Sequence, residues 1–260
     1  MLTKEQKAHF DAFGFLRLPQ LFSTEEIEAV RQASIDVITQ YEGANTLDSD
    51  EGWSIGGFME RHPLLITLLD DDRIHGIPET LLGPDFILHQ TEGRSRAGNT
   101  SWHGPVPAEH ELRTVKINFY LDKLTKETGA LRFVPGSHEP SNPDLYEELR
   151  ANNDDPEFRP FGLKPSEIPC FAAESNPGDL VVFTEHTLHS SFGGSLDRQQ
   201  HAINFMENPR SDDQVTYIKN LYESWKYGLR PAESYINSDR PRIRRMVSRL
   251  VEWGFETSKV

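Results

Sequence analysis

Apolar and polar side chains alternate along the middle of the chain, as they do in β-strands with one buried face. Residues 115–121 show this alternation without interruption, and residues 202–206 repeat it. Residues 130–134 and 179–183 are short apolar runs bounded by Gly or Pro, which fits further strands. Several short strands separated by turns predict a mainly β protein, built as a barrel or a double-sheet jelly roll.

Helical periodicity is strongest near the two ends of the chain. Residues 3–6 and 23–26 have the spacing of a capping box, so we expect a helix to begin at each of them, with a strand at residues 15–18 between. The second helix has an apolar face that is interrupted by one small polar residue, Ser34. Residues 241–253 place apolar side chains on one helical face, with arginines opposite.

Two polar segments predict loops. Residues 42–62 are rich in Gly and polar residues, and residues 139–168 are long enough to form a lid or a substrate loop. Residues 64–69 and 79–82 predict short helices between the loop and the strands. We expect one domain, residues 1–260, that consists of a helical N-terminal part (1–85), a jelly-roll core (about 86–210) and a helical C-terminal segment (211–260).

Composition excludes several classes of partner and site. The net charge of −14 argues against nucleic acid and against an anionic membrane surface. No apolar run approaches the roughly 18 residues that cross a bilayer, and the first residues lack a secretory signal. Cys170 is the only cysteine, which excludes an intrachain disulfide and a thiolate metal cage. We therefore expect a cytoplasmic protein.

A set of motifs in a fixed order resembles the phytanoyl-CoA dioxygenase family. The set covers nearly the whole chain and is specific as an ordered group. Its members are Trp102-His103, the strand around Lys116 and Asn118 that ends in Tyr120-Leu121-Asp122, Thr128-Gly129-Ala130-Leu131-Arg132-Phe133-Val134-Pro135-Gly136-Ser137-His138, Pro177-Gly178-Asp179-Leu180-Val181-Val182-Phe183, and the block from His189 to Arg198. The resemblance implies a double-stranded β-helix (cupin-like jelly roll), Fe(II) and 2-oxoglutarate as cofactors, and O2 as co-substrate.

The same resemblance implies roles for three residues. His103 and His189 would bind the iron, because neutral imidazoles suit a borderline divalent metal. Arg198 would pair with the distal carboxylate of 2-oxoglutarate, since a guanidinium offers two parallel hydrogen bonds. Gln199 and Gln200 are alternatives if the register differs. We expect Lys116 and Asn118 to line the pocket and to contact the cofactor if the apolar residues of their strand pack outward.

Other histidines are weaker metal ligands. His138 lies in a predicted turn. His186 lies three residues before His189, and an odd spacing on a strand would point the two rings to opposite faces. Trp102 is expected to pack rather than to react.

Pro105 occupies the position where the family has its third ligand, a carboxylate two residues after the first histidine. Proline has no donor atom, and three hypotheses follow. Chloride or bromide fills the vacancy beside Gly104 and Pro105, as in related iron halogenases, although those have Gly or Ala at this position. Alternatively Glu109, Glu111 or water completes a hydroxylase site. In the third, iron binds weakly and the protein is catalytically silent. The sequence leads us to prefer the halogenase hypothesis slightly.

The predicted enzyme oxidises an aliphatic C–H bond of a small molecule that the sequence does not identify. Arg94 and Arg96 are candidates for binding an anionic group of that substrate. A cupin-like binding protein without turnover is the alternative from another class, and a zinc hydrolase is disfavoured because no third ligand with a nearby base is evident. The oligomeric state stays open.

Overall fold

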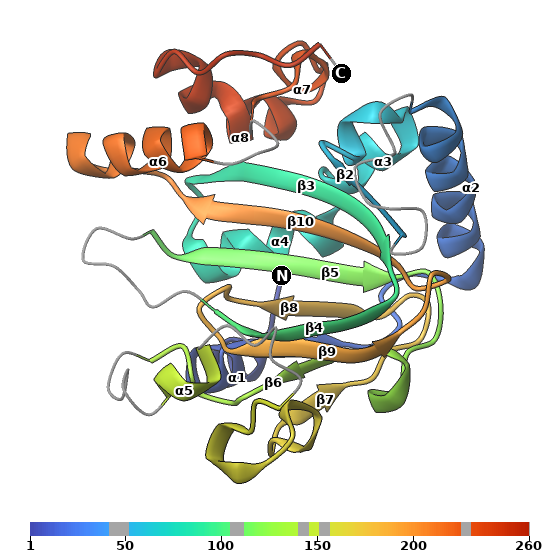
Figure 1. Cartoon of the computed structure of the whole chain (residues 1–260). Coiled ribbons are helices and arrows are strands. Elements are labelled where there is room, and N and C mark those ends of the chain that lie inside the picture. Colours follow the sequence, from blue (N-terminus) through green and yellow to red (C-terminus); the bar gives the residue numbers. More distant parts are fainter. Residues whose placement is uncertain (42–51, 105–111, 140–145, 151–156, 225–229, 260) are drawn as a thin grey trace.

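The computed structural model describes residues 1–41, 52–104, 112–139, 146–150, 157–224 and 230–259. Its strands form two antiparallel sheets (Figure 1). The six-stranded sheet has the order β1 (Phe15–Leu18), β8 (Leu180–Phe183), β5 (Thr114–Tyr120), β10 (Gln199–Glu207), β3 (Phe86–Arg96) and β2 (Gly52–Gly56). The four-stranded sheet has the order β4 (Gly98–His103), β9 (His189–Gly194), β6 (Leu131–Phe133) and β7 (Phe171–Ala173). The predicted mainly β architecture is confirmed.

Helices flank the sheets. The N-terminal ones are α1 (Lys4–Phe13), α2 (Thr24–Gln40), α3 (Pro63–Leu68) and α4 (Asp72–Leu82), and the later ones are α5 (Glu147–Arg150), α6 (Asp212–Ser224), α7 (Glu233–Ile236) and α8 (Pro241–Glu252). Short 3-10 helices lie at Met59–Arg61, Lys126–Thr128, Pro160–Gly162 and Pro165–Glu167. In Figure 1 the C-terminal helices gather next to β3, whereas α2 and α3 lie beside β2. Of the described helices, none is both long and apolar enough to cross a membrane.

The outer face of the six-stranded sheet forms the main core with the helices. Val115, Ile117 and Phe119 of β5 project to this face and pack with Ile203 and Phe205 of β10. The residues between them on each strand project to the other face, because side chains alternate along a strand. That inner face meets the four-stranded sheet across a second, smaller cluster that includes Tyr120, Phe133 and Phe183.

The capping predictions at the N-terminus are confirmed. Thr3 caps α1 and Ser23 caps α2, and each side chain accepts a hydrogen bond from the backbone N–H of the third helical residue. The side chain of that third residue in turn accepts a hydrogen bond from the backbone N–H of the capping residue. Gly14 ends α1 with a φ of 80°, and an added Cβ there would lie 2.2 Å from the Thr187 hydroxyl. Only glycine combines that left-handed backbone with so close a contact.

Two predictions for the N-terminal part need correction. Residues 52–56 are not loop but strand β2, which pairs with β3, while residues 42–51 lie outside the described residues. The second short helix is longer than predicted, since α4 begins at Asp72 and accommodates Pro78 in its interior. Residues 52–56 form a strand because they pair with β3, which is distant in the sequence, and their polar composition alone did not predict this.

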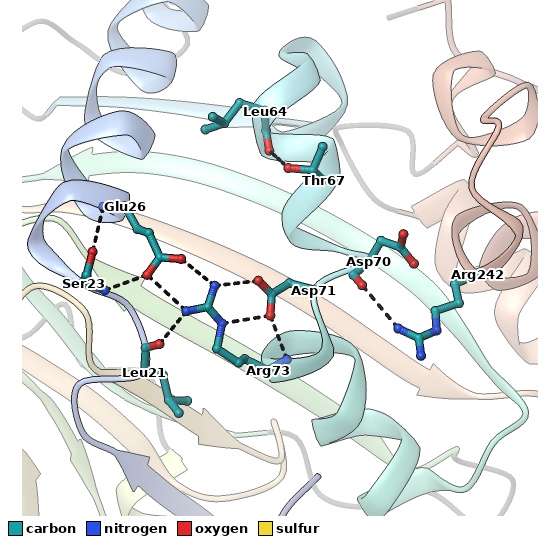
Figure 2. Close-up of polar contacts among 9 residues, drawn as sticks. All are labelled: Leu21, Ser23, Glu26, Leu64, Thr67, Asp70, Asp71, Arg73 and Arg242. Carbon is teal, nitrogen blue, oxygen red and sulfur yellow. Dashed lines mark hydrogen bonds and ion pairs between the residues drawn. The ribbon is translucent and has the colours of Figure 1, made fainter.

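A polar network ties α2 to the start of α4 (Figure 2). The guanidinium of Arg73 donates to both Glu26 carboxylate oxygens at 2.7 and 3.1 Å, to Asp71 at 2.7 Å and to the Leu21 carbonyl at 2.8 Å. Hydrogen bonds to these two carboxylates raise the pKa of Arg73 above its usual value. Bidentate pairing of this kind fixes geometry as well as charge, so the network sets how the helical layer lies on the sheet.

Candidate active site

Two histidines lie next to each other on neighbouring strands of the four-stranded sheet. His103 ends β4 and His189 begins β9, and their Cα atoms are register partners. Directly opposed residues of antiparallel strands have side chains close together, and here the ring centroids are 4.0 Å apart. The pair is therefore formed by strand pairing between two segments far apart in sequence.

Each imidazole is oriented by a backbone carbonyl. The Nδ1 atom of His103 is 2.8 Å from the Ser101 carbonyl, and that of His189 is 2.7 Å from the Thr187 carbonyl. These carbonyls accept a hydrogen bond from Nδ1–H, so the proton of each ring is on Nδ1 and each Nε2 has a free lone pair, which is the usual arrangement of a metal-binding histidine. Burial lowers the pKa of both imidazoles, and the proximity of His103 lowers that of His189 further. The lowered pKa values favour the neutral imidazole, which is the form that binds a metal.

An inner cavity extends from the histidines between the two sheets. Its lining includes Thr100, Ser190 and Ser191 from the four-stranded sheet and Asn118 and Gln200 from the six-stranded sheet. Arg198 reaches into it from the residue before β10 and is only 6% exposed.

Arg198 has unused hydrogen-bonding capacity inside this cavity. Its guanidinium lies beside Tyr120 and is 3.4 Å from the phenol oxygen, while its Nε is buried without a partner among the described residues. Gly129 makes room for it, because a Cβ there would lie 2.9 Å from the Arg198 Cδ. A buried, incompletely paired guanidinium is costly unless an anion completes its hydrogen bonds.

Lys116 and Asn118 project to the inner face of β5, as the alternation predicts. The Asn118 Oδ1 atom is buried and lacks a partner among the described residues. Lys116 forms an ion pair with Glu185 at 3.6 Å. Both residues line the inner cavity, whereas contact with a cofactor stays a prediction.

A second cavity of about 530 Å³, here called the outer cavity, is also lined by His103 and His189. Its lining includes Arg94 and Arg96 of β3, together with apolar residues of β10 and α6. A volume of this size accommodates a small organic molecule. The structure thus places both arginines singled out in the sequence beside the histidine pair.

Glu92 and Glu185 also line the outer cavity, and sequence analysis missed both. Burial raises the pKa of Glu92, but nearby Arg94 and Lys116 lower it more, so the carboxylate is charged. The alternation of residues 92, 94 and 96 on β3 is the signal that could have found Glu92. Glu185 lies in the turn before β9, where no pattern in the sequence distinguishes it.

The third ligand position lies outside the described residues, since Pro105, Glu109 and Glu111 all belong to residues 105–111. Within the described parts of the chain, no group of three His, Cys, Asp or Glu residues is arranged to hold a metal. Gly104 is described, and a Cβ at this residue would lie 3.2 Å from the Thr187 carbonyl oxygen. The backbone after His103 therefore packs tightly against the segment before His189.

His186 differs from its prediction, whereas His138 lies apart from the site. His186 precedes β9 and lies in a turn, so the strand spacing that would separate it from His189 does not apply, and both line the outer cavity. His138 instead contacts the end of α1, with its Nε2 3.2 Å from the Asp11 carbonyl. Trp102 is buried and donates to the Pro165 carbonyl at 2.8 Å, which agrees with a packing role.

The residues present fit the cofactors that the family resemblance implies. Two neutral, carbonyl-oriented imidazoles provide two nitrogen ligands for iron. The unpaired Nε of Arg198 and the polar lining around it suit the carboxylate of 2-oxoglutarate. The two described ligands alone leave the iron site incomplete.

The two antiparallel sheets, with paired histidines at one end of the inner cavity and an arginine within it, define a double-stranded β-helix of the iron and 2-oxoglutarate oxygenase class. This chain belongs to the phytanoyl-CoA dioxygenase family, whose family model matches residues 10–198. It is accordingly an enzyme of the oxygenase class.

Individual relatives and solved structures agree with this class. Ectoine dioxygenase of Bordetella parapertussis is 24% identical over 262 residues, covering 90% of this chain and 82% of that protein. The crystal structure of HygX from Streptomyces hygroscopicus with nickel and 2-oxoglutarate bound matches with a TM-score of 0.64 and 21% identity, over 80% of this chain and 88% of that one. EctD from S. alaskensis with bound Fe matches with a TM-score of 0.61 and 20% identity, over 79% and 77% of the two chains. These structures confirm the predicted jelly-roll fold.

Proposed function

We propose that this protein is an Fe(II)- and 2-oxoglutarate-dependent oxygenase that oxidises an aliphatic C–H bond of a small molecule held in the outer cavity. The observation that supports it best is the position of the histidine pair. His103 and His189 line both the inner cavity, which holds the buried Arg198, and the outer cavity of about 530 Å³. A cofactor held by the arginine and a substrate in the cavity would therefore meet at the histidines.

Each residue has a defined task in this proposal. His103 and His189 hold the iron through Nε2, and the Ser101 and Thr187 carbonyls keep both rings in the required tautomer. Arg198 binds the distal carboxylate of 2-oxoglutarate and orients the cofactor. When bound, iron and 2-oxoglutarate together supply the oxidising chemistry.

Hydroxylation is the reaction outcome that we propose first, because the curated relatives that match are named as dioxygenases. Halogenation with chloride or bromide is the second candidate, and the observation that favours it is Pro105, which has no donor atom where the family has a carboxylate. Glu109, Glu111 or water at the third position would favour hydroxylation. The slight preference for halogenation that the sequence alone suggested is thus reversed.

The test is 2-oxoglutarate turnover by the purified protein loaded anaerobically with Fe(II). We expect succinate formation that requires both iron and O2, and a further increase when a substrate is present. His103→Ala is the matched variant and should form none. Wild-type protein that binds iron and 2-oxoglutarate but releases no succinate with any substrate would favour a silent binding protein.

The same assay separates hydroxylation from halogenation. Product from reactions with and without saturating bromide is analysed by mass spectrometry. Hydroxylated product in both supports the first candidate, and a brominated product supports the second. Pro105→Asp should then suppress bromination, because it adds an anionic ligand that competes with halide.

A further inference from the structure

Charged side chains line one side of the outer cavity. Glu92, Arg94 and Arg96 alternate along β3 and therefore project from the same face of the strand. Lys116 of β5 and Glu185 complete this charged side. The described lining thus contains three side chains that are permanently or normally cationic and two carboxylates.

Four of these five charges are paired with one another. Arg94 lies 3.5 Å from Glu92, and Lys116 lies 3.6 Å from Glu185. Arg94 also donates to the Gln200 side chain at 3.2 Å. Arg96 has no ion-pair or hydrogen-bond partner for its side chain among the described residues. One positive charge therefore stays uncompensated in the described part of this cavity.

This surplus contrasts with the composition of the chain, whose net charge is −14. A positive cavity within a negatively charged protein attracts anions and repels cations that the rest of the surface would attract. A guanidinium also matches the planar geometry of a carboxylate or the oxygens of a phosphonate, which a diffuse positive potential would not.

Another side of the same cavity is apolar. Leu112 and Met206 are buried there, and Tyr217 and Leu221 of α6 are partly buried against them. A ligand that fills the cavity would therefore contact hydrocarbon on this side and charge on the other. Burial of apolar ligand surface here would contribute affinity, while the charged side would fix the orientation.

We infer that the substrate is an amphipathic oxyanion: a small molecule whose carboxylate or phosphonate pairs with Arg96 and whose hydrocarbon part lies against Leu112, Met206, Tyr217 and Leu221. The C–H bonds between the two ends then face His103 and His189. This inference rests on the proposed function only where it states which C–H bonds face the histidines. The binding preference itself follows from the charges of the cavity.

The test is calorimetric binding of matched probes to the full-length protein loaded with Mn(II) and 2-oxoglutarate. The probes share one phenylbutyl body and differ in the head group, which is a carboxylate, a phosphonate, a neutral amide or an amine. We expect the better oxyanion to bind about tenfold more tightly than the amide, as for a charge-assisted pair, and the amine to bind most weakly. The carboxylate and phosphonate arms decide which oxyanion the cavity prefers.

Two variants assign the preference to Arg96. Arg96→Gln should remove the advantage of the oxyanion over the amide without changing amide binding, and Arg96→Glu should make the amine the tightest probe. The matched control is Arg249→Gln, which removes the same charge from the exposed side of α8 and should retain the wild-type preference.

The outcomes also separate this inference from the proposed function. Binding of 2-oxoglutarate is measured first in the same titrations, and its absence would contradict the proposed function. With 2-oxoglutarate bound, oxyanions that bind no better than the amide, or not measurably at millimolar concentration, would overturn the inference. An equal loss for oxyanion and amide in Arg96→Gln would overturn it as well, because that result indicates a change in shape rather than charge recognition.

Discussion

The outer face of the six-stranded sheet and the four-stranded sheet opposite its inner face place histidines in opposite situations. His201 of β10 projects to the outer face and is fully buried between Phe58 and Phe119, with ring centroids 4.9 and 5.1 Å away. Its Nε2 is 3.0 Å from the hydroxyl of Ser34, which itself donates to the Val30 carbonyl. On the inner side, His189 is equally buried, but it faces a second histidine and two cavities.

The difference shows that burial and a lowered pKa do not by themselves identify a functional histidine. Burial lowers the pKa of His201 to about 3 and also lowers that of His189 well below its usual value. His201 uses Nε2 for Ser34, and its Nδ1 is buried outside both cavities, without a partner among the described residues. Both inner histidines use Nδ1 for a carbonyl and line the cavities with Nε2 available. What distinguishes the site is an available lone pair beside a cavity.

Removing an inner histidine should have the largest effect on function. His103→Ala and His189→Ala should each abolish iron retention, because the proposed site has only these two described ligands and therefore no redundancy. Metal content after desalting measures the effect. Either variant retaining stoichiometric iron with wild-type affinity would contradict the site.

Loss of the inner arginine, Arg198, should weaken the binding of one cofactor only. Arg198→Ala should weaken 2-oxoglutarate binding by about tenfold to a hundredfold, as expected for a charge-assisted pair, and leave iron affinity nearly unchanged. Calorimetric titration of each cofactor measures both effects. If 2-oxoglutarate affinity is unchanged, its carboxylate is bound elsewhere, with Gln200 or Lys116 as the next candidates.

The outer-face histidine should matter for stability instead of chemistry. His201→Ala removes a buried ring from between two aromatic side chains and leaves the Ser34 hydroxyl without its donor. We expect the free energy of unfolding to fall by about 2–3 kcal/mol, measured by urea denaturation. The iron content of the folded variant should equal that of wild type. If His201→Ala lost iron without losing stability, the distinction between His201 and the inner histidines would be contradicted.

Buried neutral histidines should make the fold acid-sensitive. Burial lowers the pKa of His201 to about 3 and that of His89 to about 4, from an ordinary value of 6.5. Between the lowered pKa of each histidine and 6.5, the unfolded chain binds more protons than the folded one. The contribution of each neutral histidine to the free energy of unfolding is therefore complete above pH 6.5 and is lost as the pH decreases. The slope is about 1.4 kcal/mol per pH unit for each histidine. The free energy of unfolding, measured by urea denaturation at several pH values between 7 and 4.5, should therefore fall less steeply with decreasing pH in His201→Asn than in wild type.

The Arg73 network should have the smallest effect, because its side chains are partly exposed to solvent. Arg73→Gln removes the ion pairs to Glu26 and Asp71. The Arg73 side chain that forms them is 35% exposed. We expect a loss of about 1 kcal/mol, since solvent screens partly exposed pairs. Arg249→Gln breaks one exposed pair on α8 and should cost less; an equal loss in both would mean that the network adds nothing beyond a surface pair.

Much of the fold could be predicted from the sequence, since local pattern and local structure agree in most elements. The alternation in residues 115–121 gave β5 with its correct inner and outer faces, and both capping boxes formed. The small polar residue on the apolar face of α2, Ser34, has its explanation only in the structure, where it meets His201. Strand β2 was missed because its order comes from pairing with β3, a contact that its own composition does not encode.

The sequence by itself identified the candidate residues of the proposed site: two histidines, one arginine and a proline at the position where the family resemblance leads us to expect a carboxylate. Tertiary structure alone decided that His103 and His189 are register partners and that Glu92 and Glu185 compensate Arg94 and Lys116 while Arg96 stays unpaired in the described residues. The physical reason is distance. A motif fixes which atoms a segment offers, but ion pairs and shared cavities depend on contacts within a few ångströms between segments that only folding brings together.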